Sequence, residues 1–125
     1  MKILLIKGSL RGENSHSLMV EGICEETDSE VKEIYLGNTR IEHCRGCFAC
    51  WKVTPGRCAI KDDMAGIISD ILDSDVIILC FPLYFFGVSS PMKTLMDRLL
   101  PLKMPYKGCL STEENPVIMD FRHDL

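Results

Sequence analysis

Four of the chain's seven cysteines are concentrated in one short segment whose spacing could support metal binding or redox chemistry. The segment has the pattern C-x2-C-x2-C-x7-C and contains Cys44, Cys47, Cys50 and Cys58. Four thiolates satisfy an iron–sulfur cluster, for which three closely spaced cysteines and a more distant fourth are a common ligand set. Zinc also accepts four thiolates, although its sites usually pair two C-x-x-C units. The C-x-x-C spacing of Cys47 and Cys50 also permits a redox dithiol, so the pattern leaves three uses open.

Composition restricts the partners and the compartment of the protein. The 125 residues predict one domain, 1–125, and the 18 acidic and 14 basic side chains give a formal net charge of -4. The basic residues are scattered, which argues against nucleic acid as a partner. The apolar run Ile3 to Ile6 is too short for a signal peptide, and no run is long enough to span a membrane. We therefore expect a cytoplasmic protein with reduced thiols.

Strand-like and helix-like segments alternate along the chain. Continuous apolar runs predict strands at 2–7, 75–81 and 116–121, the second of them ending at Pro82, and alternation of apolar and polar residues predicts another strand at 31–36. Helical periodicity predicts helices between them, while the cysteine segment is expected to be a long loop. This order predicts an α/β fold with a doubly wound parallel sheet in three layers, α/β/α. Ligands of such sheets bind beyond the carboxyl ends of the strands, where the strand order reverses.

Three helices are predicted from their apolar faces and their start signals. Asp62 or Asp63 is the expected N-cap of one helix, and Ser89 or Ser90, followed by Pro91, that of another. We expect Asp97 and Arg98 to be surface or interface charges near the end of the latter helix. The predicted apolar faces comprise Leu18, Met19, Gly22 and Ile23 in the first helix, Met64, Ile67, Ile68, Ile71 and Leu72 in the second, and Met92, Leu95, Met96 and Leu99 in the third.

The loop after the first strand is rich in hydrogen-bond donors and precedes a helix. Serine hydroxyls, an arginine and the N-terminus of a helix together favour an anion such as a phosphate. The loop has neither the P-loop pattern nor G-x-G-x-x-G, so a mononucleotide fits better than ATP or NAD. Polar turn and capping residues are the alternative interpretation. The candidate residues are Ser9, Arg11, Ser15, His16 and Ser17.

The loop after the third strand combines aromatic residues with a glycine. Three aromatic side chains at a strand end could form an apolar wall for a planar ring, and the glycine would let the backbone approach it. A local hydrophobic cluster is the alternative, but the position of the loop favours a ligand. The residues are Pro82, Leu83, Tyr84, Phe85, Phe86 and Gly87.

These motifs together resemble a known family. "KGSLRGENSHS" and "CFPLYFFGVSSPMKTLMDR" resemble the flavodoxin-like NAD(P)H-dependent FMN reductases, and "CRGCFACWKVTPGRCAIKDDM" resembles their iron-sulfur flavoprotein subset. The resemblance implies that Ser9, Arg11, Ser15 and His16 surround the FMN phosphate, with Ser17 as an extra donor. It implies that Pro82, Leu83, Tyr84, Phe85 and Gly87 border the ribityl chain and flavin ring. It also favours a 4Fe-4S cluster on the four cysteines. Leu10 and His16 depart from the family pattern.

The resemblance implies a flavodoxin-like oxidoreductase in which the flavin carries the chemistry. NAD(P)H or a ferredoxin-like donor would reduce FMN, and a small acceptor such as a quinone or free flavin would be reduced in turn. Compared with the family pattern, the fold is expected to be truncated at its carboxyl end and to have about four strands. Apolar strand faces would then be uncovered, which predicts a homo-oligomer. The alternative is a non-catalytic remnant or metal-binding module. For Trp51 we expect a loop-anchoring role, and for Cys24, Cys80 and Cys109 no role beyond packing.

Overall fold

The computed structural model describes residues 1–11 and 15–103, with only the backbone of residues 15–17. Its centre is a parallel sheet of β1 (Lys2–Lys7), β2 (Glu30–Tyr35) and β3 (Val76–Cys80) in the order β2-β1-β3. Leu4 of β1 is in register with Lys32 of β2 and with Ile77 of β3. The central strand β1 is buried from Ile3 to Lys7 because strands flank it on both sides. The predicted parallel α/β sheet is thus confirmed, and its strand order reverses at β1.

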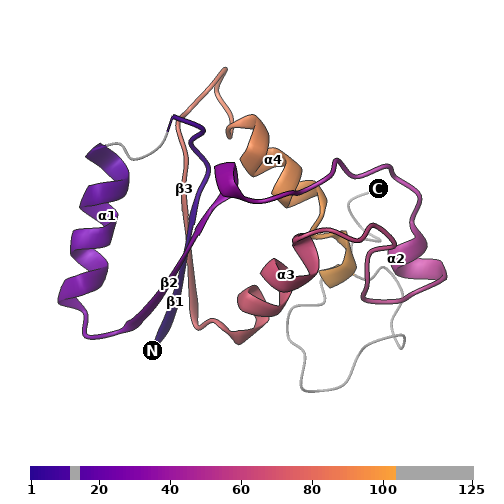
Figure 1. Cartoon of the computed structure of the whole chain (residues 1–125), viewed down its shortest axis with the longest axis horizontal. Coiled ribbons are helices and arrows are strands. Elements are labelled where there is room, and N and C mark those ends of the chain that lie inside the picture. Colours follow the sequence, from indigo (N-terminus) through magenta and orange to yellow (C-terminus); the bar gives the residue numbers. More distant parts are fainter. Residues whose placement is uncertain (12–14, 104–125) are drawn as a thin grey trace.

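Helices cover both faces of this sheet (Figure 1). The helix α1 (Ser15–Glu26) lies on one face, while α3 (Met64–Asp73) and α4 (Ser90–Asp97) lie on the other. The three-layer arrangement that the sequence predicts is therefore present. The core between the sheet, α3 and α4 consists of Leu4, Ile6, Ile34, Leu36, Met64, Ile67, Met92 and Leu95.

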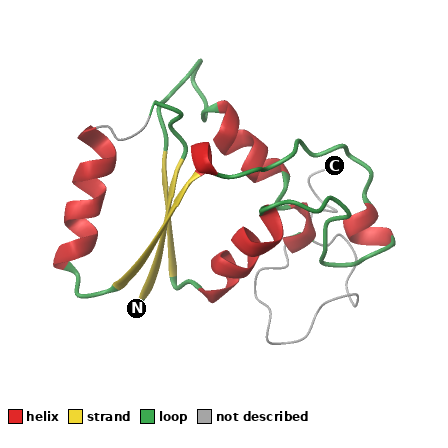
Figure 2. Cartoon of the chain, viewed as in Figure 1, coloured by secondary structure: helices red, strands yellow, loops and turns green. Residues whose placement is uncertain are grey.

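The cysteine segment extends sideways from the sheet between β2 and α3 (Figure 2). It follows the 3-10 turn η1 (Leu36–Asn38) and includes one helical turn, α2 (Ala49–Lys52), where the sequence predicts only loop. A second 3-10 turn, η2 (Leu100–Leu102), follows α4 and contacts α2. The segment is therefore attached to the fold at its two ends and, through α2, also at η2 after α4.

The predicted apolar face of α1 is wrong. Leu18, Met19 and Ile23 are each more than half exposed, and among the described side chains of this helix, 18–26, Cys24 is the buried one. An ion pair contributes to the attachment of α1 to the sheet, because the buried Lys7 contacts Glu21 of α1 as well as Glu33 of β2. Burial lowers the pKa of Lys7, but the two carboxylates outweigh this effect and raise it overall. Charge pairing thus replaces part of the expected apolar contact.

The starts of α3 and α4 match the prediction in position but not in mechanism. Asp63 is the N-cap of α3 without a capping side-chain hydrogen bond, and the Asp62 carboxylate accepts one from Met64 N at 3.0 Å instead. Ser89 is the N-cap of α4 and also lacks a capping bond. Its hydroxyl instead donates to the Gly8 carbonyl at 2.7 Å. The capping residues therefore join different segments of the chain.

Two predicted core positions of α3 and α4 face solvent. Leu72 is 49% exposed and Met96 is 42% exposed, whereas Met64 and Met92 are fully buried. Val76, Ile77 and Leu79 of β3 are also between 38% and 42% exposed. Among the described helices none is long and apolar enough to cross a membrane. The predicted strand at 116–121 and Cys109 lie outside the residues that the structure describes.

Candidate functional site

The loops that follow β1 and β3 meet at the carboxyl edge of the sheet. Gly8 N donates to Cys80 O at 2.7 Å, and the Ser89 hydroxyl holds the Gly8 carbonyl from the start of α4. A Cβ at Gly8 would lie 2.9 Å from Met92 Cε and 3.2 Å from Phe81 Cβ, so only glycine fits this approach without movement of its neighbours. Gly8 thus fixes two predicted ligand loops side by side at the point where the strand order reverses.

Two residues of the predicted phosphate loop have described side chains. Ser9 is buried, and its hydroxyl oxygen accepts a hydrogen bond from Arg11 N at 3.3 Å, while Arg11 itself is exposed. Ser15, His16 and Ser17 form the first turn of α1, and their side chains are outside the description. The five residues therefore share one end of the sheet, and their contact with a phosphate stays a prediction.

The loop after β3 forms a tight turn with an aromatic tip. Tyr84 N donates to Gly87 O at 3.1 Å, and Gly87 N donates to Tyr84 O at 3.0 Å. The two residues between them, Phe85 and Phe86, have φ angles of 47° and 62°. Two successive positive φ angles are typical of a type I′ turn, which favours Asn-Gly and is strained for bulky side chains.

The aromatic tip is not part of the protein core. Phe85 is 99% exposed, Phe86 94% and Leu83 71%, while Tyr84 is just over half exposed. The alternative of a buried hydrophobic cluster is therefore wrong for this loop. Strained backbone and exposed aromatic side chains together are a feature of ligand-binding loops. Pro82 and Gly87, at the two ends of the loop, are partly buried.

Two cavities of the described part of the chain do not include the aromatic tip. One of about 210 Å³ lies beyond the ends of β1 and β2 and is lined in part by Leu10, Leu36 and Pro91. A larger one, of about 570 Å³, lies between α3 and the end of the cysteine segment and includes Cys58 and Met64. None of the predicted flavin residues lines the larger cavity, so we do not assign it to a flavin.

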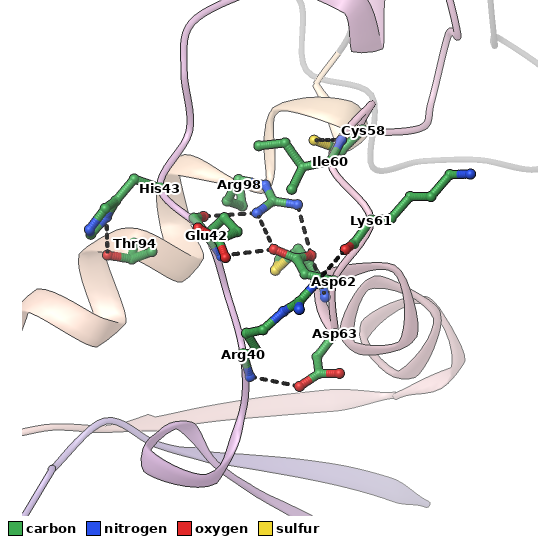
Figure 3. A network of polar contacts seen from close by, with 11 residues as sticks. Arg40, Glu42, His43, Cys58, Ile60, Lys61, Asp62, Asp63, Thr94 and Arg98 are labelled. Atoms are coloured by element: carbon green, nitrogen blue, oxygen red, sulfur yellow. Dashed lines mark hydrogen bonds and ion pairs between the residues drawn. The ribbon is translucent and has the colours of Figure 1, made fainter.

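A network of hydrogen bonds joins the two ends of the cysteine segment (Figure 3). Arg40 N donates to the Asp63 carboxylate at 2.7 Å, and Asp63 N donates back to Arg40 O at 3.1 Å. Glu42 N donates to the Asp62 carboxylate at 2.8 Å. Arg98 reaches the same place from α4 and donates to Glu42 O at 2.8 Å. The two ends of the segment are thus joined to each other and to the end of α4.

Arg98 forms a buried ion pair, which corrects its predicted role as a surface or interface charge. Its side chain is 1% exposed, that of Asp62 is fully buried, and two hydrogen bonds of 2.7 and 3.0 Å join them. Arg98 lowers the pKa of Asp62 to about 2, helped by the backbone N–H groups of Glu42 and Met64 and opposed by burial. The sequence did carry a signal, because Asp62 and Arg98 belong to the "KDDM" and "DR" motifs quoted above.

The four cysteines of the segment line one small cavity, together with Arg98. Gly46, with a φ of 65°, and Phe48, with a φ of 55°, turn the chain so that its sulfurs face a common space. That space is about 20 Å³, close to the volume one water needs, so a cluster would require the segment to widen. The structure therefore brings Cys44, Cys47, Cys50 and Cys58 together, as the spacing indicates.

Backbone groups and burial set the chemistry of these thiols. Gly46 N donates to Cys44 Sγ at 3.5 Å, and Ile60 N donates to Cys58 Sγ at 3.4 Å. Burial raises the pKa of Cys50, and the nearby Cys58, Cys44 and Cys47 raise it further. A metal must therefore displace a proton from Cys50 in order to bind it.

The present arrangement of the sulfurs is not that of a bound zinc ion. Thiolates on one zinc ion lie about 3.8 Å apart, given Zn–S bonds of about 2.3 Å in a tetrahedron. Within residues 1–11 and 15–103 no group of three or more His, Cys, Asp or Glu side chains is arranged to hold a single metal ion. The six cysteines in that part of the chain are also free thiols. Four cysteines around one space, with backbone N–H groups directed at two sulfurs, are a donor type that a multi-iron group uses, and such a group would require this space to widen.

Trp51 anchors the helical turn α2 of the cysteine segment. Its indole Nε1 donates to Leu100 O in η2 at 2.9 Å, and its ring packs against Phe48 with a centroid separation of 4.7 Å. The predicted loop-anchoring role of this tryptophan is confirmed. Cys50, which follows Ala49 in the same turn, is thereby held close to η2.

The fold and the site define a doubly wound α/β protein with a serine- and arginine-containing loop, an aromatic loop and a four-cysteine segment. The family model described as "NADPH-dependent FMN reductase" matches residues 1–109. The chain therefore belongs to the NADPH-dependent FMN reductase family. The predicted resemblance and the flavodoxin-like fold class are confirmed.

Relatives with a named cofactor give a finer comparison. An iron-sulfur flavoprotein of Archaeoglobus fulgidus is 34% identical over 119 residues, which cover 88% of this chain and 53% of the relative. An iron-sulfur flavoprotein of Methanocaldococcus jannaschii is 38% identical over 111 residues, which cover 86% of this chain and 56% of the relative. A solved structure of a flavone reductase has a TM-score of 0.59 at 28% identity and covers 81% of this chain and 30% of its own. The chain thus spans about half the length of these curated relatives.

Proposed function

We propose that this chain is an FMN-dependent oxidoreductase of the NAD(P)H-dependent FMN reductase type, passing electrons to a small acceptor such as a quinone or free flavin. The observation that carries the proposal is the exposed, strained aromatic turn at the end of β3, placed next to the serine and arginine loop by the 2.7 Å hydrogen bond from Gly8 N to Cys80 O. An anion-binding loop beside an aromatic wall matches a mononucleotide with a planar ring.

The phosphate end of FMN would be held by the loop after β1. The hydroxyl of Ser9 can donate to a phosphate oxygen while its oxygen accepts from Arg11 N. The exposed Arg11 side chain would supply the neutralising charge, and the N-terminus of the 12-residue α1, with Ser15, His16 and Ser17, would supply further donors. This arrangement binds one dianionic phosphate without a P-loop.

The ring end of FMN would be bordered by Pro82, Leu83, Tyr84, Phe85 and Gly87. Leu83 and Phe85 are the most exposed of these residues, so a ring placed there would remove apolar surface from water at about 25 cal/mol per Å². Bound FMN would supply two-electron exchange with NAD(P)H and one-electron exchange with a cluster.

The four cysteines would hold a 4Fe-4S cluster beside α4. Their common cavity, the backbone N–H groups directed at Cys44 and Cys58, and the likeness to iron-sulfur flavoproteins support this assignment. We further propose a cytoplasmic homo-oligomer with a ferredoxin-like protein as a second donor. The exposed apolar residues of α1 and β3 support self-association, and size-exclusion chromatography with light scattering tests it.

The visible spectrum of protein purified without oxygen, together with its flavin and iron content, tests the two cofactors. Flavin bands with a broad brown absorption and iron support the full proposal. Flavin without iron would leave a plain FMN reductase whose cysteines serve as a dithiol or are idle. A colourless protein would overturn the proposal in favour of a non-catalytic metal-binding module.

A matched pair of arginine variants tests the phosphate loop. Arg11→Ala should weaken FMN binding at least tenfold, because it removes the cation assigned to the phosphate. Arg57→Ala removes an equally exposed arginine from the cysteine segment and should leave the affinity unchanged. Quenching of FMN fluorescence measures both dissociation constants, and equal constants for Arg11→Ala and wild type would refute the assignment.

A matched pair of cysteine variants tests the cluster ligands. Cys47→Ser should abolish iron incorporation and leave flavin bound, since Cys47 belongs to the proposed ligand set. Cys24→Ser changes a buried cysteine of α1 and should retain both cofactors. Iron retained in full by Cys47→Ser would remove this residue from the ligands.

A further inference from the structure

Arg98 carries hydrogen-bond donors that its own ion pair does not use. A guanidinium has five N–H donors in a planar fork. Nη1 and Nη2 donate to the two oxygens of Asp62, and Nη1 also donates to Glu42 O. Nε is buried and has no hydrogen-bond partner among the residues that the structure describes. Planar geometry then places Nε–H and one Nη2–H parallel on one free edge of the group.

The free edge of Arg98 adjoins the cysteine cavity. Arg98 lines this cavity together with all four cysteines, and in Figure 3 its guanidinium lies between the Asp62 carboxylate and the stretch from Cys58 to Ile60. Asp62 raises the pKa of Arg98, burial opposes this, and Cys58 adds to the rise, as a nearby negative sulfur does. The positive group is thus held between a carboxylate and the sulfurs.

A buried donor without an acceptor destabilises the folded state, and such a donor is rarely left unsatisfied. A cysteine sulfur that ligates iron stays a thiolate and is a better acceptor than a thiol. Cys58 lines the same cavity as Arg98, and its sulfur raises the pKa of Arg98. Ile60 N already donates to this sulfur, so Arg98 would complete a second hydrogen bond to it.

We infer that the free edge of Arg98 donates to the Cys58 sulfur when this sulfur is a cluster ligand, and thereby raises the reduction potential of the cluster. The inference rests on the cluster proposed above. One-electron reduction adds a negative charge to the cluster, which a nearby N–H donor and positive charge stabilise. Arg98 is therefore a positioning residue that acts on the cluster through its ligand, and Asp62 keeps the guanidinium oriented.

The test measures the midpoint potential of the anaerobically reconstituted full chain by titration with dithionite, after its iron has been quantified. Arg98→Lys keeps a positive charge beside Asp62 but has no planar fork. We expect it to retain iron and to shift the potential downward by at least 59 mV, which is a tenfold change in the one-electron equilibrium constant. Lys32→Met, which removes an exposed cation of β2, should leave the potential unchanged.

Folding failure of Arg98→Lys would be bypassed by a double variant, Arg98→Met with Asp62→Leu, which removes both buried charges and avoids a lone carboxylate. Its potential should also fall by at least 59 mV. A potential equal to that of wild type in either iron-loaded variant would overturn the inference while leaving the cluster in place. Wild-type protein that incorporates no iron would instead overturn the proposed cluster, and the inference with it.

Discussion

Removal of the Asp62 charge should destabilise the protein in a way that depends on pH. The pKa of Asp62 is lowered from 3.8 to about 2, mainly by Arg98. Each pKa unit corresponds to about 1.4 kcal/mol, so the ionised carboxylate contributes about 2.4 kcal/mol to the free energy of unfolding at pH 7. The substitution also leaves Arg98 buried without a partner, and removal of one partner from a buried ion pair typically costs about 3–5 kcal/mol in total. We therefore expect Asp62→Asn to lower the free energy of unfolding by about 2.4–5 kcal/mol at neutral pH.

The pH dependence separates the charge from the shape of the side chain. A group whose pKa is lower in the folded state stabilises above its unfolded pKa, here 3.8, and loses this effect as the pH falls towards 2. The charge contribution should therefore fall from about 2.4 kcal/mol at pH 7 to about 1.3 kcal/mol at pH 3. The difference between wild type and Asp62→Asn should shrink by about 1 kcal/mol over this range.

Urea unfolding of the reduced apoprotein, followed by tryptophan fluorescence and circular dichroism, measures this difference. Trp51 lies in the cysteine segment and reports on its release, because its indole contacts η2. Asp73→Asn is the matched control, since Asp73 forms an exposed ion pair with Lys2 and should change stability by less than about 0.5 kcal/mol. A variant as stable as the control at pH 7, or a difference that does not change between pH 5 and pH 3, would refute the reasoning.

Three further substitutions follow from the fold and can be compared by thermal and urea unfolding. Phe85→Asn combined with Phe86→Gly should stabilise the apoprotein by about 1–2 kcal/mol, because Asn and Gly adopt positive φ angles with less strain than the two exposed phenylalanines. FMN titration should show a weaker affinity for this variant. A less stable apoprotein would show that the turn is not strained. Trp51→Phe should cost about 1 kcal/mol, since it removes the indole hydrogen bond to Leu100 O and leaves this carbonyl with its second donor, Lys103 N, alone, and unchanged stability would exclude the anchoring role. Gly8→Ala should cost about 1–3 kcal/mol through overpacking against α4, where the added Cβ would meet a side chain at 2.9 Å; a neutral effect would show that α4 yields easily.

The sequence alone determined the features that depend on local patterns. Apolar runs identified β1 and β3 as parallel strands, of which β1 is buried and β3 is partly exposed, and periodicity identified the helices that alternate with them. Cysteine spacing identified one thiol-rich segment, and the residues around it indicated the family. These signals are local because backbone geometry imposes the same period wherever a strand or helix occurs.

The tertiary structure alone decided which residues face one another. The sequence predicts Asp62 as a helix start and Arg98 as a surface charge. In the structure these residues, 36 positions apart, form the buried ion pair at the cysteine segment. The apolar side of α1 faces solvent, and Phe85, an apolar residue by type, is almost fully exposed. Burial and pairing depend on which segments pack together, and a one-dimensional pattern does not carry that information.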